Sequence, residues 1–331
     1  MSAGARPRLG FLGVGWIGRA RLEALAREDI ADVVAVADPD AACAQAALRC
    51  AAHATIAPDL DALLALPLDG VVVATPSALH AAQVLRALDA GLAVFCQKPL
   101  GRTAAEVRRI GAAARAADRL VGVDLSYRHT AGMQRIRELV RAGELGRIYA
   151  IDLVFHNAYG PDKPWFRDIA RAGGGCVIDL GIHLADLALW VLDFPPVARV
   201  GTRRYAEGRL LAPGEQVVED HAIVQLELAG DVTVRLACSW NLSAGQDAVI
   251  EARFDGTRGA AQFRNVDGSF YDFVAERLDG TRRMTIASPP DAWGPRALVA
   301  WARTLAHRPR FDEGFAEFVA VAHVLDRIYG R

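Results

Sequence analysis

The sequence has little of several features that mark special classes of protein. Its cysteines form no CxxC pair and no cluster with ligand spacing, which argues against a disulfide framework and a zinc ribbon. The first strand-like run begins near residue 8 without an apolar targeting segment before it, so a reduced, cytoplasmic location is expected. No stretch offers 18 uncharged apolar residues, so we expect no membrane span.

Excess charge of one sign is also missing. The chain has 38 Lys and Arg against 39 Asp and Glu, a formal net charge of −1, and no long basic run. Nucleic acids and membrane surfaces are therefore not expected as partners, and a small molecule is. With 331 residues, 52% of them hydrophobic, the chain is long enough to form two cores.

Residues 8 to about 125 alternate short apolar runs with helical stretches rich in Ala, Arg and Leu. The runs are apolar enough to be covered on both faces; they are RLGFLG, DVVAVAD, GVVVAT, LAVFCQ and LVGVDL. This alternation predicts an α/β fold with a doubly wound parallel sheet, a Rossmann domain over residues 1–126.

The pattern changes after about residue 126. A helix, the long strand RIYAIDLVFHN and a glycine-led helix come first, and five further strand-like runs follow, separated by turn residues. Two helices, around 296–307 and 314–329, complete the pattern. We therefore predict a second, α+β domain over 127–331 with a large open, mainly antiparallel sheet.

A GxGxxG pattern follows the first strand directly and opens a helix. It consists of Gly13, Gly15 and Gly18, with Trp16 and Ile17 inside it. Such glycines let the backbone approach a pyrophosphate, and the helix N-terminus supplies N–H donors. Asp38 lies twenty residues beyond Gly18, at the end of the second strand. Together these residues predict dinucleotide binding.

The same aspartate bears on which dinucleotide is bound. A carboxylate accepts hydrogen bonds from ribose hydroxyls but repels a 2′-phosphate. The following residues, PDAACAQAA, offer no Arg or Lys that could neutralise such a phosphate. NAD is therefore favoured, with NADP possible.

Two more strand ends carry polar side chains. An open α/β sheet binds its ligand outside the carboxyl ends of its strands. We therefore expect the cofactor to be contacted at these ends by Thr75, Pro76, Ser77, His80, Gln97 and Lys98. A lysine at a strand end is usually a solvated terminus, but one held in a crevice can stabilise a developing alkoxide.

The stretch GGGCVIDLGIHLADLALW carries three ionisable residues in an otherwise apolar helix. At about 100° per residue, Asp179, His183 and Asp186 fall within an arc of roughly 60°, so one face needs an explanation. Chelation of a metal is one reading, but it lacks a fourth ligand and ignores the nucleotide fold, so no metal is predicted. For Asp186, a hydrogen bond to the helix or to a dimer surface is favoured over direct catalysis.

These motifs, in this order and spacing, resemble those of the Gfo/Idh/MocA oxidoreductases over nearly the whole chain. The resemblance rests on GxGxxG, ATPSALH, the Lys-Pro after GLAVFC, YR at 127–128, the glycine-led helix and AVAHVLDRIY. It implies that Lys98, Asp179 and His183 are catalytic, and that the second domain binds substrate and mediates a homodimer or homotetramer. The family usually has glutamate where this chain has Gln97, which removes one negative charge beside Lys98.

The predicted activity is an NAD(P)-dependent hydride transfer at a secondary alcohol or ketone of a sugar, cyclitol or related polyol. The loop FHNAYGPDKPWFRD offers hydroxyl-binding groups and an aromatic platform, although it also suits a surface loop with a buried Trp. The predicted substrate-binding residues are Lys98, Tyr127, Arg128, Asn157, Tyr159, Lys163, Trp165, Asp179 and His183. Two alternatives remain: a redox-neutral NAD-dependent glycosidase or lyase, and a non-catalytic NAD-binding sensor.

Overall fold

The computed structural model describes residues 6–331, which divide into two compact units. The first unit comprises the residues up to Asp124 together with Pro295–Val319, and the second comprises Leu125–Gly294 and Ala320–Arg331. The expected division after residue 126 assigned everything beyond it to the second domain. The structure differs at 295–319, because that segment packs with the first unit.

The first unit contains a six-stranded parallel sheet in the order β3-β2-β1-β4-β5-β6. Its strands are β1 (Arg8–Leu12), β2 (Asp32–Ala37), β3 (Thr55–Ile56), β4 (Gly70–Val73), β5 (Ala93–Cys96) and β6 (Val121–Val123). The strand order reverses between β1 and β4. The carboxyl ends of these two strands therefore flank the point where such sheets bind ligands.

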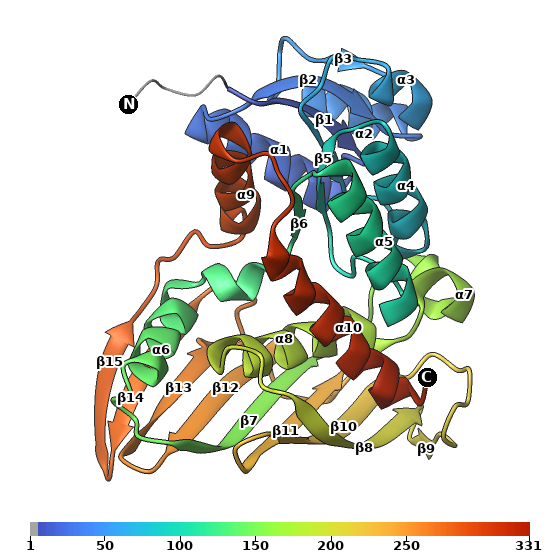
Figure 1. Cartoon of the computed structure of the whole chain (residues 1–331). Coiled ribbons are helices and arrows are strands. Elements are labelled where there is room, and N and C mark those ends of the chain that lie inside the picture. The colour runs from blue at the N-terminus through green and yellow to red at the C-terminus, as the bar shows by residue number, and fades with distance from the viewer. Residues whose placement is uncertain (1–5) are drawn as a thin grey trace. The chain divides into compact units, whose positions relative to one another are not determined.

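Helices connect the strands of this sheet. They are α1 (Trp16–Glu28), α2 (Ala41–Leu48), α3 (Leu60–Leu64), α4 (Ser77–Asp89) and α5 (Ala104–Ala117). The chain steps one way across the sheet after β1 and the other way after β4. Because such crossovers are right-handed, α1 covers one face, and α4 and α5 cover the other (Figure 1).

Helix α9 (Arg296–His307) joins α1 on its face of the sheet and completes the core (Figure 1). Its Trp301 ring lies 5.7 Å from the Phe95 ring. A Cβ atom at Gly70 or Gly122 would lie 2.9 or 2.6 Å from Trp301. Glycine in β4 and β6 therefore makes the room that this indole occupies.

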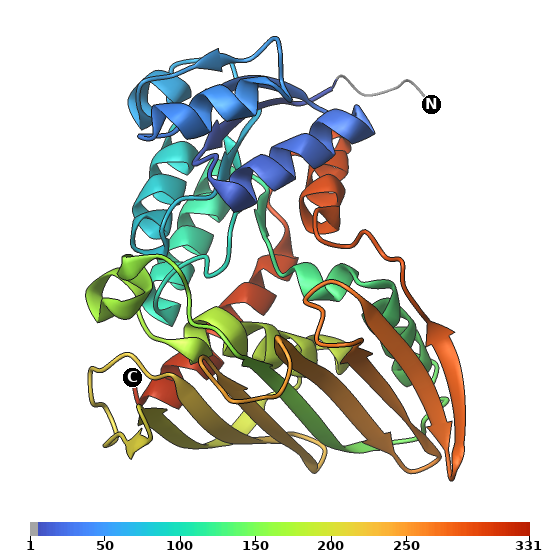
Figure 2. The ribbon, with the colours of Figure 1, turned by 180° about the vertical axis from the view of Figure 1, so that it is seen from behind.

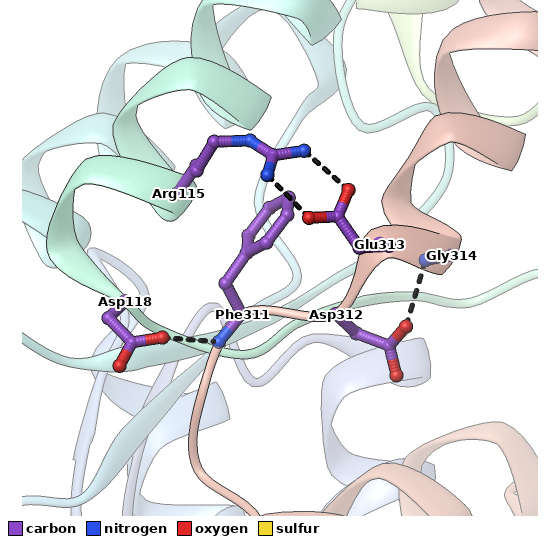
Figure 3. Close-up of polar contacts among 6 residues, drawn as sticks. All are labelled: Arg115, Asp118, Phe311, Asp312, Glu313 and Gly314. Carbon is purple, nitrogen blue, oxygen red and sulfur yellow. Dashed lines mark hydrogen bonds and ion pairs between the residues drawn. The ribbon is translucent and has the colours of Figure 1, made fainter.

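The segment after α9 is fastened to the end of α5, as Figure 3 shows. Arg115 donates to both carboxylate oxygens of Glu313, and its guanidinium lies 4.5 Å from the Phe311 ring centre. Asp118 accepts from Phe311 N at 3.2 Å, and Asp312 accepts from Gly314 N at 2.8 Å. These contacts lead the chain into η4 (Glu313–Phe315) and α10 (Ala316–Tyr329).

The second unit contains a nine-stranded sheet in the order β15-β14-β13-β12-β7-β11-β10-β8-β9 (Figure 2). The strands are β7 (Ile148–Asn157), β8 (Val197–Ala206), β9 (Arg209–Leu210), β10 (His221–Leu228), β11 (Val232–Ser239), β12 (Ala248–Gly256), β13 (Gly259–Asn265), β14 (Phe273–Asp279) and β15 (Arg282–Ala287). Only β7 and β11 pair in parallel; their other neighbours are antiparallel. The predicted fold class is confirmed.

Alternation within β10 shows how the sequence sets the two faces of this sheet. In HAIVQLEL, the buried side chains are Ala222, Val224, Leu226 and Leu228, and the residues between them are partly or fully exposed. Helices α6 (Ala131–Arg141) and α8 (Ile182–Val191) lie on one face of the sheet (Figure 1). Shorter turns are η1 (Ser126–His129), η2 (Pro164–Arg167), α7 (Ile169–Ala172) and the π-helical turn η3 (Val177–Gly181).

Within residues 6–331, one helical stretch, Ile169–Val191, is long and apolar enough to cross a membrane. It includes the glycine-led segment, and 94% of its most apolar window is buried inside the protein. Burial of this kind is what a core helix shows, and length with composition alone does not separate the two cases.

Candidate functional site

The glycine loop of the first unit has the shape that a dinucleotide requires. Gly13 has φ +85°, and a Cβ there would lie 2.6 Å from Ala74 O. A Cβ at Gly18 would lie 2.1 Å from Gly13 O, so this glycine lets α1 pack against the loop. At Gly15 an added Cβ would meet nothing within 4 Å, which leaves the space open for a phosphate. Trp16, the first residue of α1, is 66% exposed.

Asp38 lies beside this loop, as its spacing predicts. Its Oδ2 accepts from Val14 N at 2.7 Å, and its Oδ1 accepts from Asp40 N at 2.9 Å. These bonds fix the carboxylate and use one acceptor position on each oxygen. The remaining lone pairs can accept hydrogen bonds from ribose hydroxyls.

The residues after β4 form a tight loop. Ser77 begins α4 and is buried, while Thr75 and Pro76 are half-buried. His80 is 1% exposed, and its Nδ1 and Nε2 each lie 2.7 Å from a carbonyl oxygen, of Pro99 and Thr75 respectively. Both partners are acceptors, so both nitrogens donate only in the protonated ring, whereas burial lowers the pKa of His80. His80 therefore joins the two strand-end loops through its ring nitrogens, and its expected contact with the cofactor stays a prediction.

Gln97 and Lys98 follow β5 directly, and both are half-buried. Gln97 Nε2 donates to Asp124 Oδ2 at 2.5 Å, and the same oxygen accepts from Arg21 Nε at 2.7 Å. Asp124 is 1% exposed. Although glutamine at 97 removes one negative charge, a buried carboxylate is thus bound to its side chain.

In the second unit, Asp179 lies in the π-helical turn, where its carboxylate has an aromatic partner. Trp240 Nε1 donates to Asp179 Oδ2 at 3.1 Å. The Trp240 and Phe166 rings meet edge-on with their centres 6.3 Å apart, and the Phe166 and Trp165 rings stack with their centres 3.8 Å apart. Trp165, predicted to contact substrate, therefore belongs to the aromatic cluster that holds Asp179. Such π-helical turns are frequent at functional sites.

His183 lies one turn further along, at the start of α8, and is 7% exposed. Its ring centre lies 4.9 Å from that of Tyr127 and 6.5 Å from that of Phe155. Tyr127 also contacts Trp293 at 4.9 Å, and burial raises the pKa of its hydroxyl. Packing against these rings gives the imidazole a defined orientation.

Asp186, the third ionisable residue of the stretch, has a structural partner. Arg128 Nε donates to Asp186 Oδ2 at 2.8 Å and to Oδ1 at 3.0 Å, and Arg128 Nη2 also donates to Oδ1. Asp186 is 1% exposed, and the guanidinium lies 5.3 Å from the Phe194 ring centre. Asp186 thus forms hydrogen bonds, but its partner is Arg128 of η1, not the helix or dimer surface that we expected. Arg128, expected to bind substrate, is engaged in the same pair.

The remaining loop candidates lie at and after the end of β7. Asn157 is half-buried, and Tyr159, 55% exposed, donates its hydroxyl to Asp247. Lys163 is exposed and forms an ion pair with Asp162 at 3.2 Å. These three side chains are therefore spread along a partly exposed loop.

The residues present fit a dinucleotide better than a metal. Gly13 and Gly18 let the loop pack tightly, an added Cβ at Gly15 would point into open space where a phosphate can approach, and Asp38 supplies the acceptor for a ribose. Across residues 6–331, no group of three or more His, Cys, Asp or Glu side chains is placed to hold a metal ion.

Three residues of this arrangement were not anticipated from the sequence. They are Asp124, which accepts from Gln97, Arg21, which donates to Asp124, and Trp240, which donates to Asp179. Asp124 had a detectable signal, because it is a lone acid at the carboxyl end of an apolar parallel strand. Arg21 and Trp240 carry no local pattern that separates them from surface or core residues.

Two family sequence models match this chain. The model described as oxidoreductase family, NAD-binding Rossmann fold, matches residues 8–125, and that of the GFO/IDH/MocA C-terminal domain matches 133–262. The rhizopine catabolism protein MocA of Rhizobium meliloti is 31% identical over 86% of this chain and 90% of its own length. The D-glucoside 3-dehydrogenase of Escherichia coli K12 is 30% identical over 71% and 70%.

Among solved structures, levoglucosan dehydrogenase in complex with NADH has a TM-score of 0.81. The match covers 97% of this chain and 95% of that one at 20% identity. At this identity the similarity establishes the fold alone.

Proposed function

Because the chain belongs to the GFO/IDH/MocA family of NAD(P)-binding oxidoreductases, we propose that it oxidises or forms a secondary alcohol of a sugar, cyclitol or related polyol. The main support from the structure is the surroundings of two residues on the glycine-led stretch. His183 packs on Tyr127, and Asp179 accepts a hydrogen bond from Trp240. The names of the relatives support the substrate class, since inositol and glucosides are polyols.

The proposed chemistry divides between the side chains. When bound, the nicotinamide ring accepts a hydride from the carbinol carbon or returns one to the ketone. His183 takes the hydroxyl proton during oxidation and returns it during reduction. The Lys98 ammonium stabilises the alkoxide charge as it develops, and Asp179 orients the assembly from its bond with Trp240. Proton and hydride leave the same alcohol, so the step balances.

The proposed cofactor preference is NAD, with NADP as a weaker alternative. Asp38 is fixed by Val14 N and Asp40 N, so its negative charge lies where a 2′-phosphate would have to approach. The homo-oligomeric state and the cytoplasmic location stay predictions.

For substrate binding, the proposal retains Tyr127, Trp165, Asn157, Tyr159 and Lys163. Tyr127 and Trp165 have the stronger support, because each belongs to the aromatic cluster around a proposed catalytic residue. The other three lie on the partly exposed loop.

A substrate scan with matched variants tests this proposal. Purified protein is offered inositols, methyl glucosides, levoglucosan and sugar acids with NAD or NADP, and absorbance of the reduced nicotinamide is followed. His183→Ala should lower kcat by about 10²-fold or more while NAD affinity stays nearly unchanged. His323→Gln, at an exposed histidine of α10, is the control and should keep full activity.

Three outcomes would contradict the proposal. Full turnover by His183→Ala would remove the acid–base assignment. Product formed without net reduced nicotinamide would indicate the redox-neutral lyase or glycosidase instead. NAD binding without turnover of any polyol would favour the sensor.

A further inference from the structure

A buried glutamate of the second unit holds the start of the helical stretch that carries Asp179 and His183. Glu219 lies between β9 and β10 and is 0% exposed. Its Oε1 accepts from Gly175 N at 3.0 Å and from Val177 N at 2.9 Å. Its backbone carbonyl accepts from Cys176 N at 2.9 Å. One residue therefore binds three consecutive backbone N–H groups.

These N–H groups are the ones that a helix leaves without partners at its beginning. A carboxylate there also interacts favourably with the positive end of the helix dipole. The usual partner is a capping side chain just before the helix, but here it comes from a distant loop. The position at which the stretch begins is thus fixed by tertiary structure, and with it the positions of Asp179 and His183.

The glycines before the stretch permit this close approach. A Cβ at Gly175 would lie 1.9 Å from the carbonyl oxygen of Glu219, and a Cβ at Gly174 would lie 2.0 Å from the Tyr329 hydroxyl oxygen. Real Cβ contacts are never this short, so any side chain at either position would displace the loop. Gly174 and Gly175 are therefore required by close packing against Tyr329 and Glu219.

Tyr329 of α10 is the second anchor of this arrangement. Its hydroxyl donates to Glu219 Oε1 at 2.7 Å, and the residue is 2% exposed. Arg204, also buried, has its guanidinium 5.0 Å from the Tyr329 ring centre. Burial raises the pKa of Glu219, which the donors from Val177 and Tyr329 and the charge of Arg204 oppose. Three donors directed at one oxygen suit the ionised carboxylate.

A second link leads from the same loop to Asp179. Asp220, the next residue, accepts from Trp240 N through its carbonyl at 2.7 Å. Trp240 in turn donates its indole N–H to Asp179. The dipeptide 219–220 therefore holds both the start of the stretch and the ring that orients its carboxylate.

We propose that Glu219 is a positioning residue, which sets the register of the helical stretch bearing Asp179 and His183, with Tyr329 as its second anchor. This inference rests on the proposed function only for the part that concerns turnover. The hold on the backbone of residues 175–177 is a property of the free protein. It can be measured without any substrate.

The test compares Glu219→Ala, Glu219→Gln and Tyr329→Phe. Glu276→Ala is the matched control, since Glu276 is another buried glutamate of the same unit, 5% exposed, paired with Arg283 on the neighbouring strand at 2.7 Å. Hydrogen exchange of the peptide over residues 173–182 is followed by mass spectrometry. NAD affinity, kcat and KM are measured with the inositol, methyl glucoside and levoglucosan panel.

Glu219→Ala should speed exchange of residues 175–177 at least about tenfold, because two backbone hydrogen bonds to a charged acceptor are lost. Its kcat should fall about 10- to 100-fold, as expected for catalytic groups displaced by about 1 Å, with NAD affinity unchanged within about twofold. Glu219→Gln keeps an acceptor for the same donors, so its kcat should stay within about fivefold of wild type.

Tyr329→Phe removes one donor and keeps the ring, so exchange should rise by about fivefold. It covers the case in which Glu219→Ala does not fold. Unchanged exchange in Tyr329→Phe and Glu219→Ala, or equal exchange in Glu276→Ala, would overturn the proposed hold. If His183→Ala loses turnover while Glu219→Ala keeps it, the positioning role fails alone. If His183→Ala keeps full turnover, the proposed function fails, and hydrogen exchange still decides on Glu219.

Discussion

The substitution Gln97→Glu tests how the end of β5 is held. Gln97 Nε2 donates to Asp124 Oδ2 at 2.5 Å, and Arg21 Nε donates to the same oxygen at 2.7 Å. Asp124 is 1% exposed and Gln97 is half-buried, so a second carboxyl group at position 97 would lie beside the first in a poorly solvated place. In such a pair one carboxyl group keeps its proton, because two like charges this close disfavour the second ionisation.

The cost follows from the proton that the new carboxyl group must keep. Glutamate ionises at about pH 4.3 in an unfolded chain, and each pH unit above this costs about 1.4 kcal/mol if folding retains the proton. At pH 7 the cost is about 3.7 kcal/mol by this reasoning. Two unit charges about 4 Å apart repel by about 4 kcal/mol at an effective dielectric constant of about 20, which gives a similar limit. We expect the free energy of unfolding to fall by about 3 to 4 kcal/mol at pH 7.

The loss in the free energy of unfolding should depend on pH in a predictable direction. Folding raises the pKa of the new carboxyl group, so the loss is absent below about pH 4.3 and grows until the pH reaches the folded-state pKa. Urea unfolding should show a loss of about 1.6 kcal/mol at pH 5.5 and about 3.7 kcal/mol at pH 7. In an Asp124→Asn background the pH-dependent part should vanish, because one carboxyl group remains. A loss that is equal at both pH values would refute the reasoning.

Further predictions concern the cofactor and the ion pair. Asp38→Ser should weaken NAD binding about tenfold, since hydrogen bonds to a charged acceptor are lost, and adding Pro39→Arg should improve NADP binding. A wild-type protein that binds NADP about tenfold more tightly than NAD would contradict the role of Asp38. Asp186→Asn should lower the free energy of unfolding by about 3 kcal/mol, because Arg128 stays charged and buried, with kcat of the folded enzyme little changed. Lys98→Met should reduce kcat about 10²-fold at unchanged NAD affinity, measured by titration. EDTA should leave turnover unchanged; loss that a divalent ion restores would revive the metal reading.

The cofactor half of the site could be predicted largely from local sequence. Strand, glycine loop, helix and Asp38 follow one another within about thirty residues. Gly13 is required by its positive φ, and Gly18 by its close contact with the loop. Because β1 and β2 pair in parallel, the end of β2 brings Asp38 to the loop after β1. The prediction of a dinucleotide site therefore needed only residues close together in the chain.

The other half depended on contacts between residues far apart in the chain. The helical face of Asp179, His183 and Asp186 could be read from spacing, but their separate surroundings could not. Asp186 is bound by Arg128, whereas Asp179 is bound by Trp240, and helical periodicity does not distinguish an acid that meets arginine from one that meets indole. The roles given to Asp179 and His183 came from family resemblance.

By itself, the sequence determined the strand and helix periods, the parallel and antiparallel sheets, and the glycine loop with its aspartate. Local backbone sterics and the alternation of apolar side chains act over a few residues, so a linear pattern records them. Only the tertiary structure decided that α9 completes the first core, that Asp124 accepts a hydrogen bond from Gln97, and that Glu219 binds the start of the stretch bearing Asp179 and His183. These three contacts depend on which segments, distant in the chain, pack together. The partner of a buried polar group is set by that packing, so no local pattern in the sequence records it.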